Sequence, residues 1–165
     1  MEALFELADE VGQLLIARRE TLAVGESSTG GLISAALLSV PGASAYYYGG
    51  AVVYTARARR ALLQIPDEAM SEKRSASEPY AGLVARTVRL QLRTTWGLSE
   101  TGATGPSGNR YGDAAGHCCI GIAGPLERTL TLETSSSDRR ANMRVFAQTA
   151  LATLRDALKS QPTAR

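Results

Sequence analysis

The sequence is poor in the residues on which several classes of protein depend. It contains 2 cysteines, 1 histidine and 1 tryptophan among 165 residues. Cys118 and Cys119 are adjacent, so a disulfide between them would be strained, and they have no further ligands at metal-binding spacing. No apolar run reaches the ~18 residues that a membrane-spanning helix requires. We therefore expect no disulfide, no metal, no cofactor and no membrane span.

Neither positive nor negative charge is in large excess. The chain carries 18 basic and 16 acidic side chains, for a net charge of +2, which is too balanced to indicate a nucleic-acid or membrane partner. Lys73 and Lys159 are the lysines, and the other basic residues are arginines. Because a guanidinium stays charged at any working pH, the chain has few amines that can accept a proton.

The size and composition are those of one globular domain. A chain of 165 residues with 44% apolar residues can bury its own core. We expect a single domain over residues 1–160 and a frayed tail over 161–165. The first residues are acidic and amphipathic rather than basic and then apolar, which is not the pattern of a signal peptide. A cytoplasmic location is the resulting expectation.

Hydrophobic periodicity predicts helices that alternate with strands. Helical spacing covers residues 3–19, 32–40, 56–63, 79–95 and a final segment that begins after Ser137–Asp138 and ends near 160. Short strand patterns cover 21–24, 51–54, 96–103, 117–123 and 126–134. This order predicts an α/β fold, a three-layer α/β/α sandwich around a mixed, mostly parallel sheet.

Three segments gather glycine, serine and threonine near predicted strand ends. They are Glu26–Gly31, Gly42–Ser44 with Tyr54 and Arg59 close behind, and Thr101–Gly108. Ligands of open α/β sheets bind outside the carboxyl ends of the strands, and small residues let backbone N–H groups approach phosphate. We expect the three segments to converge on one anion-binding cleft beside the Ser44 hydroxyl. None of them is a P-loop, a GxGxxG fingerprint or a GxSxG elbow.

These segments also carry a family resemblance. Glu26-Ser-Ser-Thr-Gly-Gly31, Pro41-Gly-Ala-Ser-Ala45, Gly50-Ala-Val-Val-Tyr-Thr55 and Thr101-Gly-Ala-Thr-Gly-Pro106 resemble the CinA C-terminal domain. That family includes the nicotinamide-nucleotide amidohydrolases of the PncC type. The similarity is colinear over nearly the whole chain, which is too short for the additional N-terminal domain of large CinA proteins and so resembles the stand-alone type.

The resemblance implies a reaction, a substrate and a set of site residues. It implies a CinA-like fold that hydrolyses the carboxamide of nicotinamide mononucleotide to nicotinate mononucleotide and ammonia, as a homo-oligomer. Ser44 is the implied nucleophile and Tyr54 its partner, while Arg59 stands where a lysine is expected. Ser27, Thr29, Gly30, Gly31, Thr101, Gly102, Thr104 and Gly105 are the implied lining of the nucleotide pocket, with Arg139 on the phosphate. Arg110, in the glycine-rich segment, is a further candidate for binding an anion.

Three functional readings stay open at this point. The chain is an amidohydrolase in which Tyr54 or a water is the base and Arg59 gives electrostatic support, since arginine cannot accept a proton. Alternatively, it is a catalytically impaired nucleotide-binding member of the family. In the third reading it hydrolyses another substrate and uses His117 or Asp113 as proton acceptor.

Overall fold

The computed structural model describes residues 1–162 and contains a five-stranded sheet. The strands are β1 (Leu22–Glu26), β2 (Tyr47–Val52), β3 (Trp96–Ala103), β4 (His117–Ala123) and β5 (Arg128–Glu133), in the order β2-β1-β3-β4-β5. Most of the tail expected at 161–165 lies outside the described residues.

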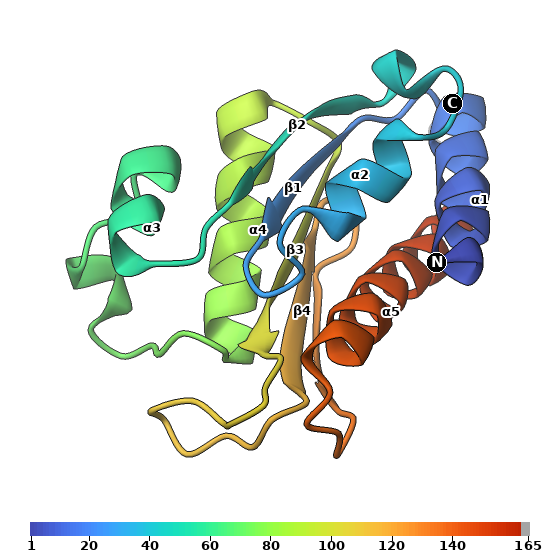
Figure 1. Cartoon of the computed structure of the whole chain (residues 1–165). Coiled ribbons are helices and arrows are strands. Elements are labelled where there is room, and N and C mark those ends of the chain that lie inside the picture. Colours follow the sequence, from blue (N-terminus) through green and yellow to red (C-terminus); the bar gives the residue numbers. More distant parts are fainter. Residues whose placement is uncertain (163–165) are drawn as a thin grey trace.

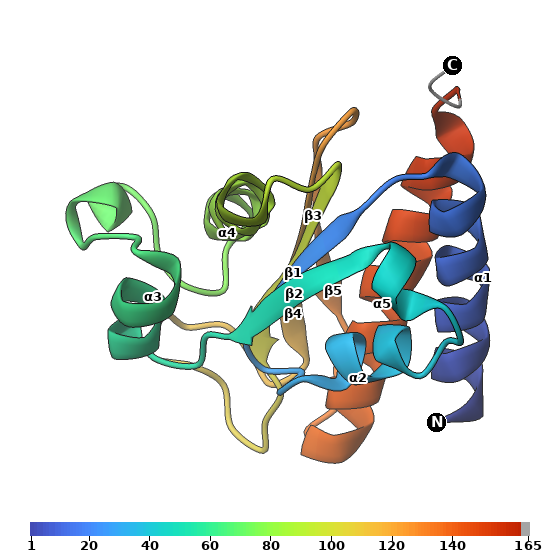
Figure 2. The ribbon, with the colours of Figure 1, turned by 90° about the horizontal axis from the view of Figure 1, so that it is seen from above.

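Helices cover both faces of the sheet, as the three-layer prediction requires (Figure 2). Helices α1 (Glu2–Arg18), α2 (Leu32–Leu38) and α5 (Arg139–Ser160) lie on one face, and α4 (Glu78–Leu92) lies on the other with α3 (Ala56–Leu63) beside it. Two short 3₁₀ turns occupy Ala43–Ala45 and Glu68–Met70. Within residues 1–162, no helix combines the length and the apolar character needed to cross a membrane.

The strand directions decide where the loops meet. β1 pairs in parallel with β2 and with β3, whereas β4 runs antiparallel to both of its neighbours. Ala103 at the end of β3 therefore lies opposite His117 at the start of β4. The loops 27–31, 53–55 and 104–116 consequently leave from the same edge of the sheet (Figure 1), which we call the carboxyl edge.

The core is divided by the sheet into two apolar clusters. The larger cluster lies between the sheet and helices α1 and α5 and includes Trp96, Phe146 and Tyr46, all fully buried. The Trp96 indole N–H donates to the Glu20 carboxylate at 2.6 Å, so its polar atom is satisfied. The smaller cluster lies under α4 and includes Val84. Each fully buried side chain of this size contributes roughly 1.5–3 kcal/mol to folding.

Two predicted boundaries are wrong for local reasons. β2 begins at Tyr47 rather than near residue 51, and it contains the glycines that suggested a loop. A Cβ at Gly50 would lie 2.6 Å from the Tyr47 hydroxyl oxygen and 2.8 Å from the Val24 carbonyl oxygen, so glycine permits this close pairing. α4 ends at Leu92 because Arg93 adopts the left-handed conformation at φ 51°.

Close contact between α4 and β3 depends on a missing side chain. A Cβ at Gly97 would come within 2.0 Å of the Ala85 carbonyl oxygen of α4. We expect Gly97→Ala to lower the free energy of unfolding by about 1–3 kcal/mol through overpacking, measured by chemical denaturation. Gly82→Ala is the matched control, since a Cβ there meets its nearest atoms at 3.4 Å and improves helix propensity. Equal stability of the two variants would contradict the expectation.

A candidate active site at the carboxyl edge

One buried carboxyl group of the neighbouring strand β3 holds the loop after β1 in place. Glu100, in the middle of β3, is 1% exposed. It accepts the backbone N–H of Ser27 at 3.1 Å and of Thr29 at 2.9 Å, and it also accepts the Ser28 hydroxyl. Because these bonds hold consecutive residues of a short loop, the backbone that carries Ser27 has a defined position at the carboxyl edge.

A second buried carboxyl group lies next to the first. The Thr29 hydroxyl oxygen is 2.8 Å from a carboxylate oxygen of Glu26 and 2.8 Å from one of Glu100. A hydroxyl has one proton, so it can donate to only one of the two. Burial raises the pKa of Glu100, against the opposing effect of the hydrogen bonds from the loop, and a protonated Glu100 supplies the second hydrogen.

This buried acid makes stability depend on pH. Because the pKa of Glu100 is higher in the folded than in the unfolded state, its contribution is complete at low pH and is lost as the pH rises from about 4.5 through the folded value. One proton gives a slope of at most about 1.4 kcal/mol per pH unit. We expect Glu100→Gln, whose amide oxygen can still accept both N–H groups, to remove that slope in denaturation experiments. Glu127→Gln, an exposed control, should retain it; the same slope in Glu100→Gln would exclude Glu100 as its source.

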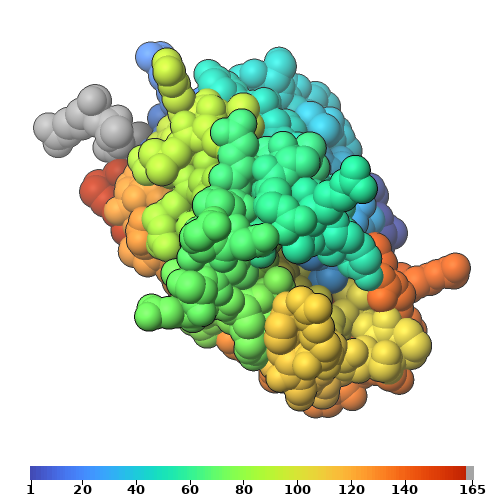
Figure 3. Space-filling model, turned by 90° about the vertical axis from the view of Figure 1, so that its left-hand side faces the viewer, coloured from blue at the N-terminus to red at the C-terminus, as the bar shows by residue number. Residues whose placement is uncertain are grey.

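Three adjoining cavities form one cleft at the carboxyl edge. The inner cavity has about 270 Å³ and includes Ser27, Arg59 and Thr101 in its wall. The outer cavity has about 620 Å³, and the side cavity about 260 Å³. Tyr54 and Asn109 line all three. Figure 3 shows this face, where the gold loop 104–116 lies beside the green segment that includes α3.

The inner cavity brings a hydroxyl, a phenol and a guanidinium together. Ser27 follows β1, Tyr54 follows β2, and Arg59 projects from α3. Arg59 is 6% exposed, and one of its terminal nitrogens donates to Asp67. Its Nε has no hydrogen-bond partner within the described chain. A buried N–H without a partner is costly, so Arg59 holds an unsatisfied donor and a positive charge at the wall of the inner cavity.

The side cavity is bounded by the loop after β3 and by the start of α5. Gly102, Thr104, Gly105 and Arg139 line it together with Tyr54. Arg139 donates to the Gly105 carbonyl at 2.8 Å and to the Tyr54 hydroxyl at 3.2 Å. Its guanidinium thus links the loop after β3 to the loop after β2. Because the Tyr54 oxygen accepts this hydrogen bond, its own phenolic proton is free to be donated.

The expectation that all three small-residue segments meet beside Ser44 is wrong for the middle segment. Ser44 lies in the 3₁₀ turn before β2, and β2 runs parallel to β1. Ser44 is therefore at the opposite edge of the sheet, on the order of 20 Å from the carboxyl edge. The parallel pairing that gathers the other loops is what separates it from Tyr54.

Three other predicted binding residues also lie outside the cleft walls. Thr29 is fully buried between the two carboxyl groups. Gly30 and Gly31 adopt positive φ values of 66° and 100°, which complete the turn into α2. The Gly31 N–H donates to Glu26 at 3.0 Å. These residues shape the loop that presents Ser27 and are not placed to contact a ligand in the cleft.

The alternative proton acceptors are engaged elsewhere. His117 Nδ1 lies 2.5 Å from a Glu133 oxygen and Nε2 lies 2.9 Å from the Ala76 carbonyl. Burial opposes its charge, but Glu133, the Ala76 carbonyl and Asp113 outweigh this and raise the pKa of His117 above 6.5. Asp113 is held by Arg74, which lowers the pKa of Asp113. Neither His117 nor Asp113 lines the three cavities.

Several cleft residues were missed by sequence reasoning. Asn109 and Tyr111 lie inside the glycine-rich segment, where aromatic and amide side chains among glycines were a usable signal. Glu100 was detectable as a charge in the middle of an apolar strand pattern. Lys73 and Arg74 come from a polar segment that gave no periodic signal, and only the tertiary structure brings them to the outer cavity.

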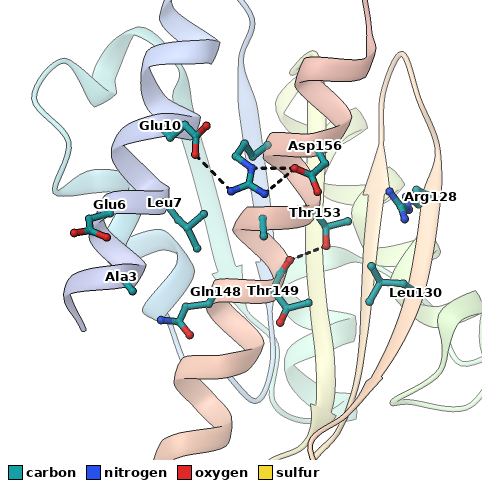
Figure 4. A pocket seen from close by; sticks show the side chains of 12 residues that line it. Ala3, Glu6, Leu7, Glu10, Arg128, Leu130, Gln148, Thr149, Thr153 and Asp156 are labelled. Atoms are coloured by element: carbon teal, nitrogen blue, oxygen red, sulfur yellow. Dashed lines mark hydrogen bonds and ion pairs between the residues drawn. The ribbon is translucent and has the colours of Figure 1, made fainter.

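A cavity of about 720 Å³, larger than any of these three, lies on the other side of the molecule between α1, α5 and β5 (Figure 4). Three of its charged side chains are paired with one another, since Arg155 pairs with Glu10 and with Asp156. None of the residues selected from the sequence lines it. The cleft at the carboxyl edge is therefore the candidate active site.

Comparisons with known proteins identify the family of the chain. The family model described as CinA C-terminal domain matches residues 4–158. A CinA-like protein of Desulforapulum autotrophicum is 36% identical over 156 residues, which cover 94% of this chain and 37% of that protein. A CinA-like protein of Cyanothece sp. is 41% identical over 119 residues, 72% of this chain and 28% of that protein. The chain thus spans about a third of the length of these relatives.

Solved structures show the same architecture. A CinA superfamily protein of Klebsiella pneumoniae superposes with a TM-score of 0.90 at 26% identity, covering 96% of this chain and 99% of that one. The competence/damage inducible protein CihA of Agrobacterium tumefaciens superposes with a TM-score of 0.85 at 26% identity, covering 96% of each chain.

Proposed function

The chain belongs to the CinA C-terminal domain family, and from this premise we propose that it hydrolyses the carboxamide of nicotinamide mononucleotide to nicotinate mononucleotide and ammonia. The nucleophile in this proposal is the hydroxyl of Ser27 rather than that of Ser44. The observation that carries it is the inner cavity, whose wall contains Ser27, Tyr54 and Arg59. A hydroxyl, a group that can move a proton and a fixed cation are what amide hydrolysis through an acyl-enzyme requires.

The first step forms a bond between Ser27 and the substrate. Ser27 Oγ attacks the carboxamide carbon, and the electron pair of the C=O bond moves to oxygen. The guanidinium of Arg59, which lines the inner cavity, stabilises this developing oxyanion. Because Glu100 holds the loop, the backbone that carries the hydroxyl does not have to be ordered when the substrate binds.

The proton of Ser27 needs an acceptor other than Arg59, since a guanidinium cannot take one. Tyr54 is the acceptor in this proposal. Its oxygen takes the serine proton while its own proton passes to the amide nitrogen, which leaves as ammonia. Water then cleaves the resulting ester, releases nicotinate mononucleotide and returns the proton to Ser27.

The test is release of ammonia from nicotinamide mononucleotide by the purified full chain, with nicotinate mononucleotide identified as the second product. Stoichiometric formation of both products supports the proposal. Absence of both products at saturating substrate overturns the hydrolytic function.

A binding function without turnover is the second candidate. Arg59 occupies the position where the resemblance predicts a lysine, and its charge is held by Asp67. A site with no basic amine can bind a nucleotide and still fail to activate a hydroxyl. Thermal stabilisation by nicotinamide mononucleotide without ammonia release would favour this candidate.

A further inference from the structure

The outer cavity is rimmed by positive charge. Lys73, Arg74 and Arg110 line it, together with Arg59 at its junction with the inner cavity. The carboxylate of Asp67 lines it as well, paired with Arg59 and Arg60. Its volume of about 620 Å³ exceeds that of the inner cavity, about 270 Å³. A ligand whose amide reaches Ser27 in the inner cavity therefore has room to extend its other end past Arg59 into the outer one.

The cations of the rim differ in how far they are neutralised. Arg74 makes two hydrogen bonds to the Asp113 carboxylate, one of them at 2.9 Å. Lys73 and Arg110 have no carboxylate partner in the part of the chain that the structure describes. Because an anion is attracted most strongly by charges that are not already paired, Lys73 and Arg110 are the groups available to it.

Arg110 is held in place by an aromatic ring rather than by an acid. Its guanidinium carbon lies 5.1 Å from the centroid of Tyr111, and its Nη2 donates to the Tyr111 hydroxyl at 3.0 Å. This hydrogen bond lowers the pKa of Tyr111. The guanidinium of Arg74 is 5.5 Å from the same ring centroid. A stacked guanidinium keeps its remaining N–H donors for a ligand and loses less side-chain conformational entropy when the ligand binds. Both properties favour bidentate hydrogen bonding to a phosphate.

We propose that Arg110, assisted by Lys73, binds the phosphate of the substrate in the outer cavity and makes the site selective for a nucleotide over the corresponding nucleoside. This inference rests on the proposed amidohydrolase function for the orientation of the ligand. The residue proposed to bind the phosphate differs from Arg139, which the family resemblance implied for this role. The guanidinium of Arg139 is committed to Gly105 and Tyr54 at the side cavity.

The kinetic test compares nicotinamide mononucleotide with nicotinamide riboside, which lacks the phosphate. Arg110→Ala is expected to raise KM for the mononucleotide about 10–100-fold, in line with loss of a charge-assisted hydrogen bond, and to leave kcat/KM for the riboside unchanged. Lys73→Ala should act in the same direction with a smaller effect, because an ammonium lacks the rigid, planar pair of N–H donors with which a guanidinium matches two phosphate oxygens. Arg128→Ala, beside the cavity of about 720 Å³ between α1, α5 and β5, is the matched control and should alter kinetics with neither substrate. An equal change for both substrates in Arg110→Ala, or no change for either, overturns the assignment.

A binding experiment separates this inference from the proposed reaction. Ribose 5-phosphate and ribose are titrated into the full chain and into Arg110→Ala by calorimetry. If the chain releases no ammonia but binds ribose 5-phosphate through Arg110, the phosphate subsite is supported and the proposed hydrolysis is contradicted. If the chain hydrolyses the mononucleotide while Arg110→Ala retains wild-type KM and phosphate binding, the proposed hydrolysis is supported and the assignment of Arg110 to the phosphate is contradicted.

Discussion

Replacing Ser27 by alanine is expected to lower kcat for ammonia release from nicotinamide mononucleotide by at least about 10³-fold, because the proposed bond to the substrate cannot form. The substitution removes only the hydroxyl, while the backbone N–H of residue 27 keeps its bond to Glu100. The variant should therefore fold and still bind the nucleotide. Steady-state ammonia release and calorimetric binding measure the two effects separately.

Ser44→Ala is the matched control. Ser44 is exposed in the turn before β2, at the other edge of the sheet, so the same deletion there should leave kcat within about twofold. The opposite pattern, in which Ser44→Ala is inactive and Ser27→Ala retains activity, would contradict the assignment of the nucleophile and would require the substrate to bind at the amino ends of the strands.

Replacing Arg59 by methionine should have the second largest effect. Methionine fills the same buried space without a charge, so the oxyanion loses its proposed donor and kcat should fall about 10²–10³-fold. The folded state should tolerate the change, because Asp67 retains Arg60 as a partner at 2.9 Å. Arg60→Met is the control, since Arg60 shares Asp67 but does not line the cleft, and its activity should be close to that of the wild type.

The variant Arg59→Lys tests whether position 59 acts through its positive charge alone or can also take part in proton transfer. Lysine keeps the positive charge and adds an amine that can lose its proton when it is partly desolvated. Activity at or above the wild-type level is expected from this variant. Retention of full activity by Arg59→Met would exclude an electrostatic role for this position, whatever Arg59→Lys does.

The fold was predictable because most of its signals are local. The strand pattern of 96–103 and the helical pattern of 56–63 match β3 and α3 residue for residue. β2 was mislocated because Gly50 is used for close pairing with β1, where a Cβ would come 2.8 Å from the Val24 carbonyl oxygen. Such a contact joins segments that are distant in sequence, and no pattern within the strand itself records it.

The candidate site was predictable in part for the same reason. Ser27, Tyr54 and Thr101 follow strand patterns or lie near their ends, so the rule that ligands bind at carboxyl ends selected them correctly as neighbours. Ser44 was selected by composition and resemblance, but it precedes its strand, and the direction of β2 places it at the wrong edge. Lys73 and Arg74 reach the cleft through an irregular segment, whose path depends on tertiary packing.

A crystal structure of Ser27→Ala with nicotinamide mononucleotide tests the central claim most directly. The account predicts that the carboxamide carbon lies in the inner cavity, about 3–3.5 Å from the position that the missing hydroxyl would occupy. It also predicts that the carboxamide oxygen faces Arg59 and that the phosphate lies beside Arg110. A nucleotide bound next to Ser44, or in the cavity between α1 and α5, would contradict the account.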